Sequence, residues 1–171
     1  MSARNQLIAA LISAFLSATG VLAQAVQPVD LSKPVTNPRL VEAIRQHQRL
    51  QRNETATALF EELRSSVLLV PIVHAKPPDQ TSPTQLLFKK GDQIVVVDVR
   101  DKKDSRLLAL FTDHIELRRF TGQANSAFVM PSKDAMAFVL EKGYSGLVIN
   151  PASEATLRMD TPFIRTVIGK M

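Results

Sequence analysis

Apolar residues recur at helical spacing in two segments that follow residue 37. In "NPRLVEAIRQHQRL", Asn37 is a candidate N-cap, Pro38 takes the first helical position, and Leu40 and Ile44 lie on one side. In "NETATALFEELRSS", the apolar positions of residues 56–63 fall at i, i+3, i+4 and i+7. The pattern therefore predicts two helices before the first strand.

The middle of the chain changes to the short apolar runs that are typical of strands. Residues 67–73, "VLLVPIV", predict a buried strand whose hydrogen bonding is limited by Pro71. Residues 85–100 predict two strands around a Gly-Asp turn, and residues 106–111 predict a third in an antiparallel meander. The Pro-rich and Ser-rich residues 74–85 predict an exposed loop.

Capped helices and short strands alternate in the last third of the chain. Asp113 and Glu116 have the spacing of a capping box, Ser132 is a candidate N-cap, and Gly143 suits the left-handed residue after a helix. Thr161 and the proline after it begin a final helix. Strands are predicted in "SAFVM" and "GLVINP", and an edge strand in "TLRMD". Together these elements predict an α+β fold, a single domain with a mixed, largely antiparallel sheet flanked by short helices.

The first residues have the features of an export signal. Arg4 precedes the uncharged residues 7–16, "LIAALISAFL", and small residues stand at Ala23 and Ala25 in an A-x-A pattern. Polar residues and Gly20 interrupt this stretch, which is unfavourable for a permanent membrane span. We therefore expect a periplasmic or secreted protein with no stable membrane span after cleavage; the alternative is a cytoplasmic protein whose first helix packs on the domain.

These features predict three regions along the chain. They are a signal peptide at 1–25, a Pro-containing linker at 26–36 and the α+β domain at 37–171.

Composition narrows the chemistry that this domain can perform. The 171 residues are 45% hydrophobic and carry a formal charge of +5, typical of one globular domain. No cysteine is present, which excludes disulfides, Cys-bound metals and thiol nucleophiles. Three scattered histidines and the lack of a glycine-rich phosphate loop predict no metal and no cofactor. Arg45, Arg49 and Arg52 fall at i, i+4 and i+7, but with one Tyr and no Trp we interpret them as a solvated helix face, not a nucleic-acid site.

Five motifs, in order, resemble the N-terminal domain family of SseB, the enhanced serine sensitivity protein. They are "NPRLVEAI", "LFEEL", "SSVLLVPI", "ALFTDHIEL" and "GLVINPASE", and they extend over residues 37–170. The resemblance implies a small bacterial α+β domain without established catalytic residues. Longer members of that family carry a second domain.

The candidate binding residues are the polar side chains around "FTDHIEL" and "GLVINPASE". They are Thr112, Asp113, His114, Asn150 and Ser153. Ligands of mixed sheets commonly bind beyond strand ends, where capped helix starts present backbone donors. We expect a non-enzymatic domain that binds a protein partner, to which the apolar face of the closing strand and helix could also contribute. The alternatives are a small hydrolase that uses His114 with Asp113, and a cytosolic regulatory domain.

Overall fold

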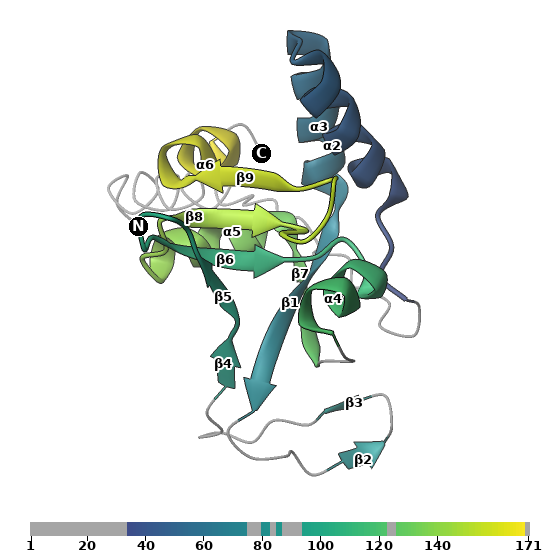
Figure 1. The fold of residues 1–171 in the computed structure, drawn as a ribbon, viewed down its shortest axis with the longest axis vertical. Coiled ribbons are helices and arrows are strands. Elements are labelled where there is room, and N and C mark those ends of the chain that lie inside the picture. Colours follow the sequence, from purple (N-terminus) through teal and green to yellow (C-terminus); the bar gives the residue numbers. More distant parts are fainter. Residues whose placement is uncertain (1–33, 75–79, 83–84, 87–93, 123–125, 170–171) are drawn as a thin grey trace, which may run out of the picture.

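The computed structural model describes residues 34–74, 80–82, 85–86, 94–122 and 126–169 (Figure 1). The predicted signal peptide and most of the predicted linker lie outside these residues. The helices are α2 Pro38–Leu50, α3 Asn53–Ser65, α4 His114–Thr121, α5 Ser132–Glu141 and α6 Thr161–Ile168. The strands are β1 Val67–His74, β2 Gln80–Ser82, β3 Gln85–Leu86, β4 Ile94–Val96, β5 Asp98–Arg100, β6 Arg106–Leu110, β7 Ala127–Pro131, β8 Gly146–Ile149 and β9 Leu157–Asp160.

The strands form a three-stranded sheet in the order β4-β1-β7, a four-stranded sheet in the order β5-β6-β8-β9, and a short β2-β3 pair. β6 and β8 are parallel and the other described pairs are antiparallel. Leu69 and Phe111 join the two larger sheets through reciprocal backbone hydrogen bonds of 2.9 Å. The predicted α+β class is confirmed, but two sheets replace the single sheet that was expected.

The predicted meander is only half correct. β5 and β6 form the expected hairpin, whereas β4 pairs with β1 and β3 pairs with β2. Val97, between β4 and β5, donates its N–H to the Pro71 carbonyl at 3.0 Å, and the chain changes sheet at this point. The loop prediction for residues 74–85 is wrong at β2 and at the first residue of β3, which are strand. Residues 75–79 and 83–84 of the predicted loop lie outside the described residues.

Pro71 is accommodated inside β1 because the strand changes partner there. Ile72 donates to Ser126 at 3.0 Å, so the even-numbered residues of β1 bond β7. The backbone groups of the odd-numbered residues point to the opposite edge of β1. There Leu69 exchanges backbone hydrogen bonds with Phe111, and the Pro71 carbonyl accepts from the Val97 N–H. Pro71 lies opposite Val97, so the proline leaves only one bond of this pair, the one in which Val97 donates to the Pro71 carbonyl, and the loss is confined to the last position of the β1–β4 pairing.

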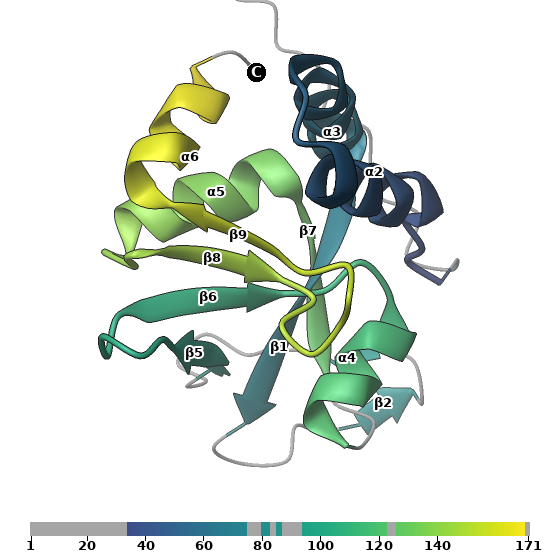
Figure 2. The ribbon, with the colours of Figure 1, turned by 45° about the horizontal axis from the view of Figure 1, so that its top comes forward.

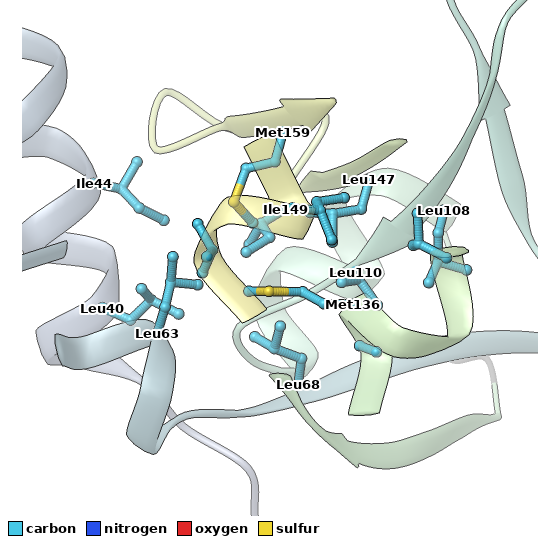
Figure 3. Close-up of a cluster of buried hydrophobic side chains, with 14 of the residues drawn as sticks. Leu40, Ile44, Leu63, Leu68, Leu108, Leu110, Met136, Leu147, Ile149 and Met159 are labelled. Carbon is cyan, nitrogen blue, oxygen red and sulfur yellow. The ribbon is translucent and has the colours of Figure 1, made fainter. Parts of the chain in front are cut away.

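The larger core lies between the four-stranded sheet and helices α2, α3, α5 and α6 (Figures 1 and 2). Figure 3 shows Leu40 and Ile44 of α2 and Leu63 of α3 at one side of a cluster that includes Leu108 and Leu147 of the sheet. A smaller core on the other face of the sheet brings together Leu69, Ala109, Phe111 and Leu117 of α4. Most residues of the predicted apolar helix faces thus lie in the core, with the exception of Phe163 on α6, which is exposed.

Two predicted N-cap side chains have other roles. Asn37 precedes α2 as predicted, but its Nδ2 donates to the carbonyls of Val67 at 2.8 Å and Thr112 at 2.7 Å. Ser132 is the first residue of α5 rather than its cap, and its hydroxyl donates to the Leu63 carbonyl. Both side chains donate hydrogen bonds to backbone carbonyls in other parts of the fold, and these long-range partners cannot be predicted from local spacing.

Candidate binding site

The five predicted binding residues meet at the carboxyl end of the parallel strands. β6 and β8 end side by side, with Leu110 paired to Ile149. Thr112 follows β6 after one residue and Asn150 follows β8 directly. The other three lie in the first turn of α4 and in the loop that leads to β9. The fold therefore brings the five residues to the same end of the sheet.

Thr112 and Asn150 in this cluster are internal structural groups. Both are buried, at 0% and 1% exposure. The Asn150 Oδ1 accepts from the Thr112 N–H at 3.0 Å, and its Nδ2 donates to the Thr112 Oγ1 at 3.0 Å. Asn150 has a left-handed backbone with φ of 52°, and its carbonyl accepts from the Ser153 N–H at 3.0 Å. Their hydrogen-bonding groups hold the two strand ends together and do not face outward.

Asp113 is the N-cap of α4, as predicted. Its Oδ1 accepts from the N–H groups of Ile115 and Glu116 at 2.8 and 2.9 Å, and its Oδ2 accepts from the Thr112 hydroxyl at 2.9 Å. The reciprocal half of the capping box is wrong, because Glu116 Oε1 accepts from Arg119 at 2.5 Å instead. The Glu116 Oε2 is buried without a hydrogen-bond partner among the described residues. The Asp113 carboxylate is thus committed to the helix start.

His114 and Ser153 form the accessible part of the cluster. The His114 side chain is exposed, and in the described part of the chain no hydrogen bond joins its ring to Asp113 or to a serine. The Ser153 hydroxyl accepts from the Ala155 N–H at 3.2 Å and lies 3.5 Å from Arg119 Nη1. No group of three or more His, Asp or Glu side chains is placed to hold a metal ion within the described ranges.

A second feature, a groove between α3 and α6, was not singled out from the sequence. Its centre is the pair of rings Phe60 and Phe163, whose centroids lie 5.6 Å apart. Two adjoining hollows of about 310 and 560 Å³ lie on either side of this pair. We call them together the α3–α6 groove. Its apolar lining consists of Ala56, Leu59, Phe60, Leu63, Leu157, Met159, Phe163 and Val167.

The α3–α6 groove runs along the free edge of the four-stranded sheet. β9 is the last strand of that sheet (Figure 2). Its four residues line the larger hollow together with residues of α3. Phe163, in the first turn of α6, is 41% exposed. Gln48 of α2 donates to the Thr156 carbonyl at 2.7 Å, so the last turns of α2 lie beside the start of β9. The groove therefore combines a strand edge with an apolar wall.

Charged groups surround the groove unevenly. Arg158 of β9 forms an ion pair with Asp101 at 2.6 Å. The pKa of Asp101 is held well below its usual value, because its carboxylate accepts from the Ser105 N–H, the Arg158 side chain and the Lys103 N–H. Arg45 and Arg49, on the part of α2 next to β9, form no ion pair with other described residues. The part of α2 beside β9 thus carries two arginines without carboxylate partners among the described residues, while the α2 residue that lines the groove itself is His47.

One wall of this groove is the apolar face of the closing strand and helix, which the sequence indicates as a surface that another protein could contact. The other wall was not predicted, because Phe60 fits the core spacing of α3 and no local pattern shows that it meets Phe163, 103 positions further along the chain.

The comparison with known families decides the assignment. The family model described as SseB protein N-terminal domain matches residues 40–166. The chain belongs to the SseB protein N-terminal domain family. The match covers the described elements from α2 to α6, as the five motifs predicted. No curated protein and no solved structure matches this SseB-family chain. Among its described helices, none is both long enough and apolar enough to cross a membrane.

Proposed function

We propose that this SseB-family chain is a non-enzymatic domain that binds a protein partner outside the cytoplasm, through the α3–α6 groove. The observation that carries the proposal is the Phe60–Phe163 pair, which lies between two hollows at a free strand edge. Large aromatic side chains in a partly exposed apolar groove are the usual anchors of protein recognition.

The cluster at the carboxyl end of β6 and β8 supports a lesser role in binding. Thr112 and Asn150 have internal partners, so a partner at this cluster would contact mainly His114 and the exposed Ile115. The hydrolase alternative requires Asp113 to orient His114. The three hydrogen bonds that Asp113 already accepts favour binding over catalysis.

Site-specific photo-crosslinking tests the groove. Benzoylphenylalanine is placed at Phe163 in one variant and at Ile115, which is 71% exposed, in the other. In the native host we expect a discrete adduct from position 163 that is absent from position 115 and is lost when Phe60→Ala is added. An adduct from position 115 alone would move the binding site to the carboxyl end of the parallel strands.

Export is proposed from the N-terminal pattern and has its own test. The intact mass is measured after the periplasmic, membrane and cytosolic fractions of the host are separated. Cleavage after Ala23 or Ala25 in the periplasmic fraction supports export. A chain that begins at Met1 in the cytosol refutes export and favours the cytosolic regulatory alternative.

A further inference from the structure

The free edge of β9 is equipped for the addition of another strand. The Thr161 N–H donates to the Ser145 carbonyl at 3.1 Å, just beyond the end of β9. In the antiparallel pairing of β8 with β9, Leu147 lies opposite Met159. Because hydrogen bonds alternate along an antiparallel pair, the N–H and C=O of Arg158 point away from β8. No other described residue bonds these two backbone groups. They are an available donor and acceptor on an exposed edge.

The groove receives the side chains that such an added strand would direct inward. Leu157 and Met159 face the core, while Arg158 and Asp160 are exposed on the opposite face of the sheet. A strand added beside β9 continues this alternation. Its inward side chains would enter the space bounded by Phe60 and Phe163, which accepts apolar groups.

Charge indicates what the outward side chains of the added strand are. The outward residue opposite Arg158 lies beside the Arg158–Asp101 ion pair, and the other end of the added strand lies near Gln48, on the turns of α2 that carry Arg45 and Arg49. Asp160 lies two residues further along, so an acidic residue is disfavoured there. Acidic side chains are therefore expected at the α2 end and neutral ones at the α6 end.

We propose that β9 binds an extended segment of a partner protein by antiparallel strand addition, with alternate apolar side chains in the α3–α6 groove and acidic side chains next to α2. This inference rests on the proposed function and specifies its partner chemistry. Main-chain hydrogen bonds supply affinity in this mode of recognition, and alternate side chains supply specificity.

The test uses fluorescence anisotropy with the labelled peptide TVTVEVEV and its counterpart TVTVKVKV. The acidic peptide places valines toward the groove and glutamates opposite Arg158 and beside α2. We expect saturable binding of TVTVEVEV and at least tenfold weaker binding of TVTVKVKV. Equal binding of both peptides would refute the charge argument. No binding of TVTVEVEV below about 1 mM would overturn strand addition, because such an affinity is too weak for recognition.

Backbone modification of the peptide isolates strand addition without changing the protein. The glutamate opposite Arg158 directs its own N–H to the Arg158 carbonyl, so N-methylation of this residue removes a donor to the edge; the Thr156 carbonyl already accepts from Gln48. We expect this change to weaken binding by about tenfold, whereas N-methylation of one valine, whose N–H points away, has a smaller effect. An equal effect of the two modifications would overturn the proposed pairing.

Protein variants provide the reciprocal test. Arg158→Pro removes the outward N–H, and Arg158→Ala keeps it while losing the same ion pair. We expect the proline variant to bind about tenfold more weakly than the alanine variant. Arg49→Glu is expected to weaken binding about threefold to tenfold, and Arg118→Glu, in the last turn of α4, is the matched control. Unchanged peptide binding by Phe163→Ala would refute the α3–α6 groove as the binding site. Binding that is lost in Phe163→Ala but retained in Arg158→Pro would refute strand addition and leave the groove as the binding site.

Discussion

The role of Asn150 is the sharpest test of whether the predicted cluster at β6 and β8 is structural. Asn150→Ala removes the acceptor of the buried Thr112 N–H and keeps a non-glycine residue at φ of 52°. A buried donor without a partner costs about 1–3 kcal/mol. Alanine in the left-handed region adds roughly 1–2 kcal/mol. We therefore expect the free energy of unfolding to fall by about 3 kcal/mol.

Asn150→Gly separates the two contributions. Glycine loses the same hydrogen bonds but adopts a positive φ without steric cost, so it should be more stable than the alanine variant by about 0.5–1 kcal/mol. The assay is urea unfolding followed by far-UV circular dichroism, with unchanged slopes as the condition for comparison. Glu154→Ala, at an exposed position of the same loop, is the control and should stay within about 0.5 kcal/mol of the parent.

Two results would refute this reasoning. An Asn150→Ala variant as stable as the parent would show that the hydrogen bonds to Thr112 contribute nothing, and would return both residues to the binding hypothesis. A glycine variant less stable than the alanine variant would contradict the argument from the left-handed backbone.

Three further variants test other parts of the fold. Asn37→Ala removes two hydrogen bonds to strand ends and should lower the free energy of unfolding by about 2 kcal/mol in urea titration. Gly146→Ala places a Cβ 2.3 Å from the Met159 carbonyl oxygen, and we expect a loss of about 2 kcal/mol or more in the same assay. Because the folded-state pKa of Asp101 is depressed, its stabilisation is present above pH 3.8 and is lost as the pH falls further. Asp101→Asn should therefore be less stable than the parent at pH 7, with a gap that narrows in thermal melts below pH 3.8.

Local pattern predicted most helices and strands because each depends on neighbours a few residues away. The helical spacing of residues 56–63, the cap at Asp113 and the left-handed Gly143 are all confirmed. The failures involve partners far away along the chain. Asn37 bonds residues 30 and 75 positions distant, which no capping rule can reveal. β4 does not join the expected meander, because it pairs with β1, which precedes both β2 and β3 in the chain and is not its neighbour in sequence.

The candidate site divides in the same way. Thr112 and Asn150 were predicted as binding residues because each follows a predicted strand, and the parallel pairing of β6 with β8 brings them together. That their side chains would bond each other is a property of the packed structure. Phe163 was visible as part of an apolar closing face, but its 41% exposure depends on how α6 lies against α3.

The proposed location of binding agrees with how few of the described strands are parallel. Ligand sites beyond the carboxyl ends of strands occur where several parallel strands leave loops with free polar groups. Here only β6 and β8 are parallel among the described strands, and the groups at their ends are consumed by mutual bonds and by the cap of α4. At β9, by contrast, no described residue bonds the outward N–H and C=O of Arg158, which lie beside the partly exposed Phe163 ring. The proposed strand addition therefore uses the edge of a sheet with one described parallel pair, rather than its strand ends.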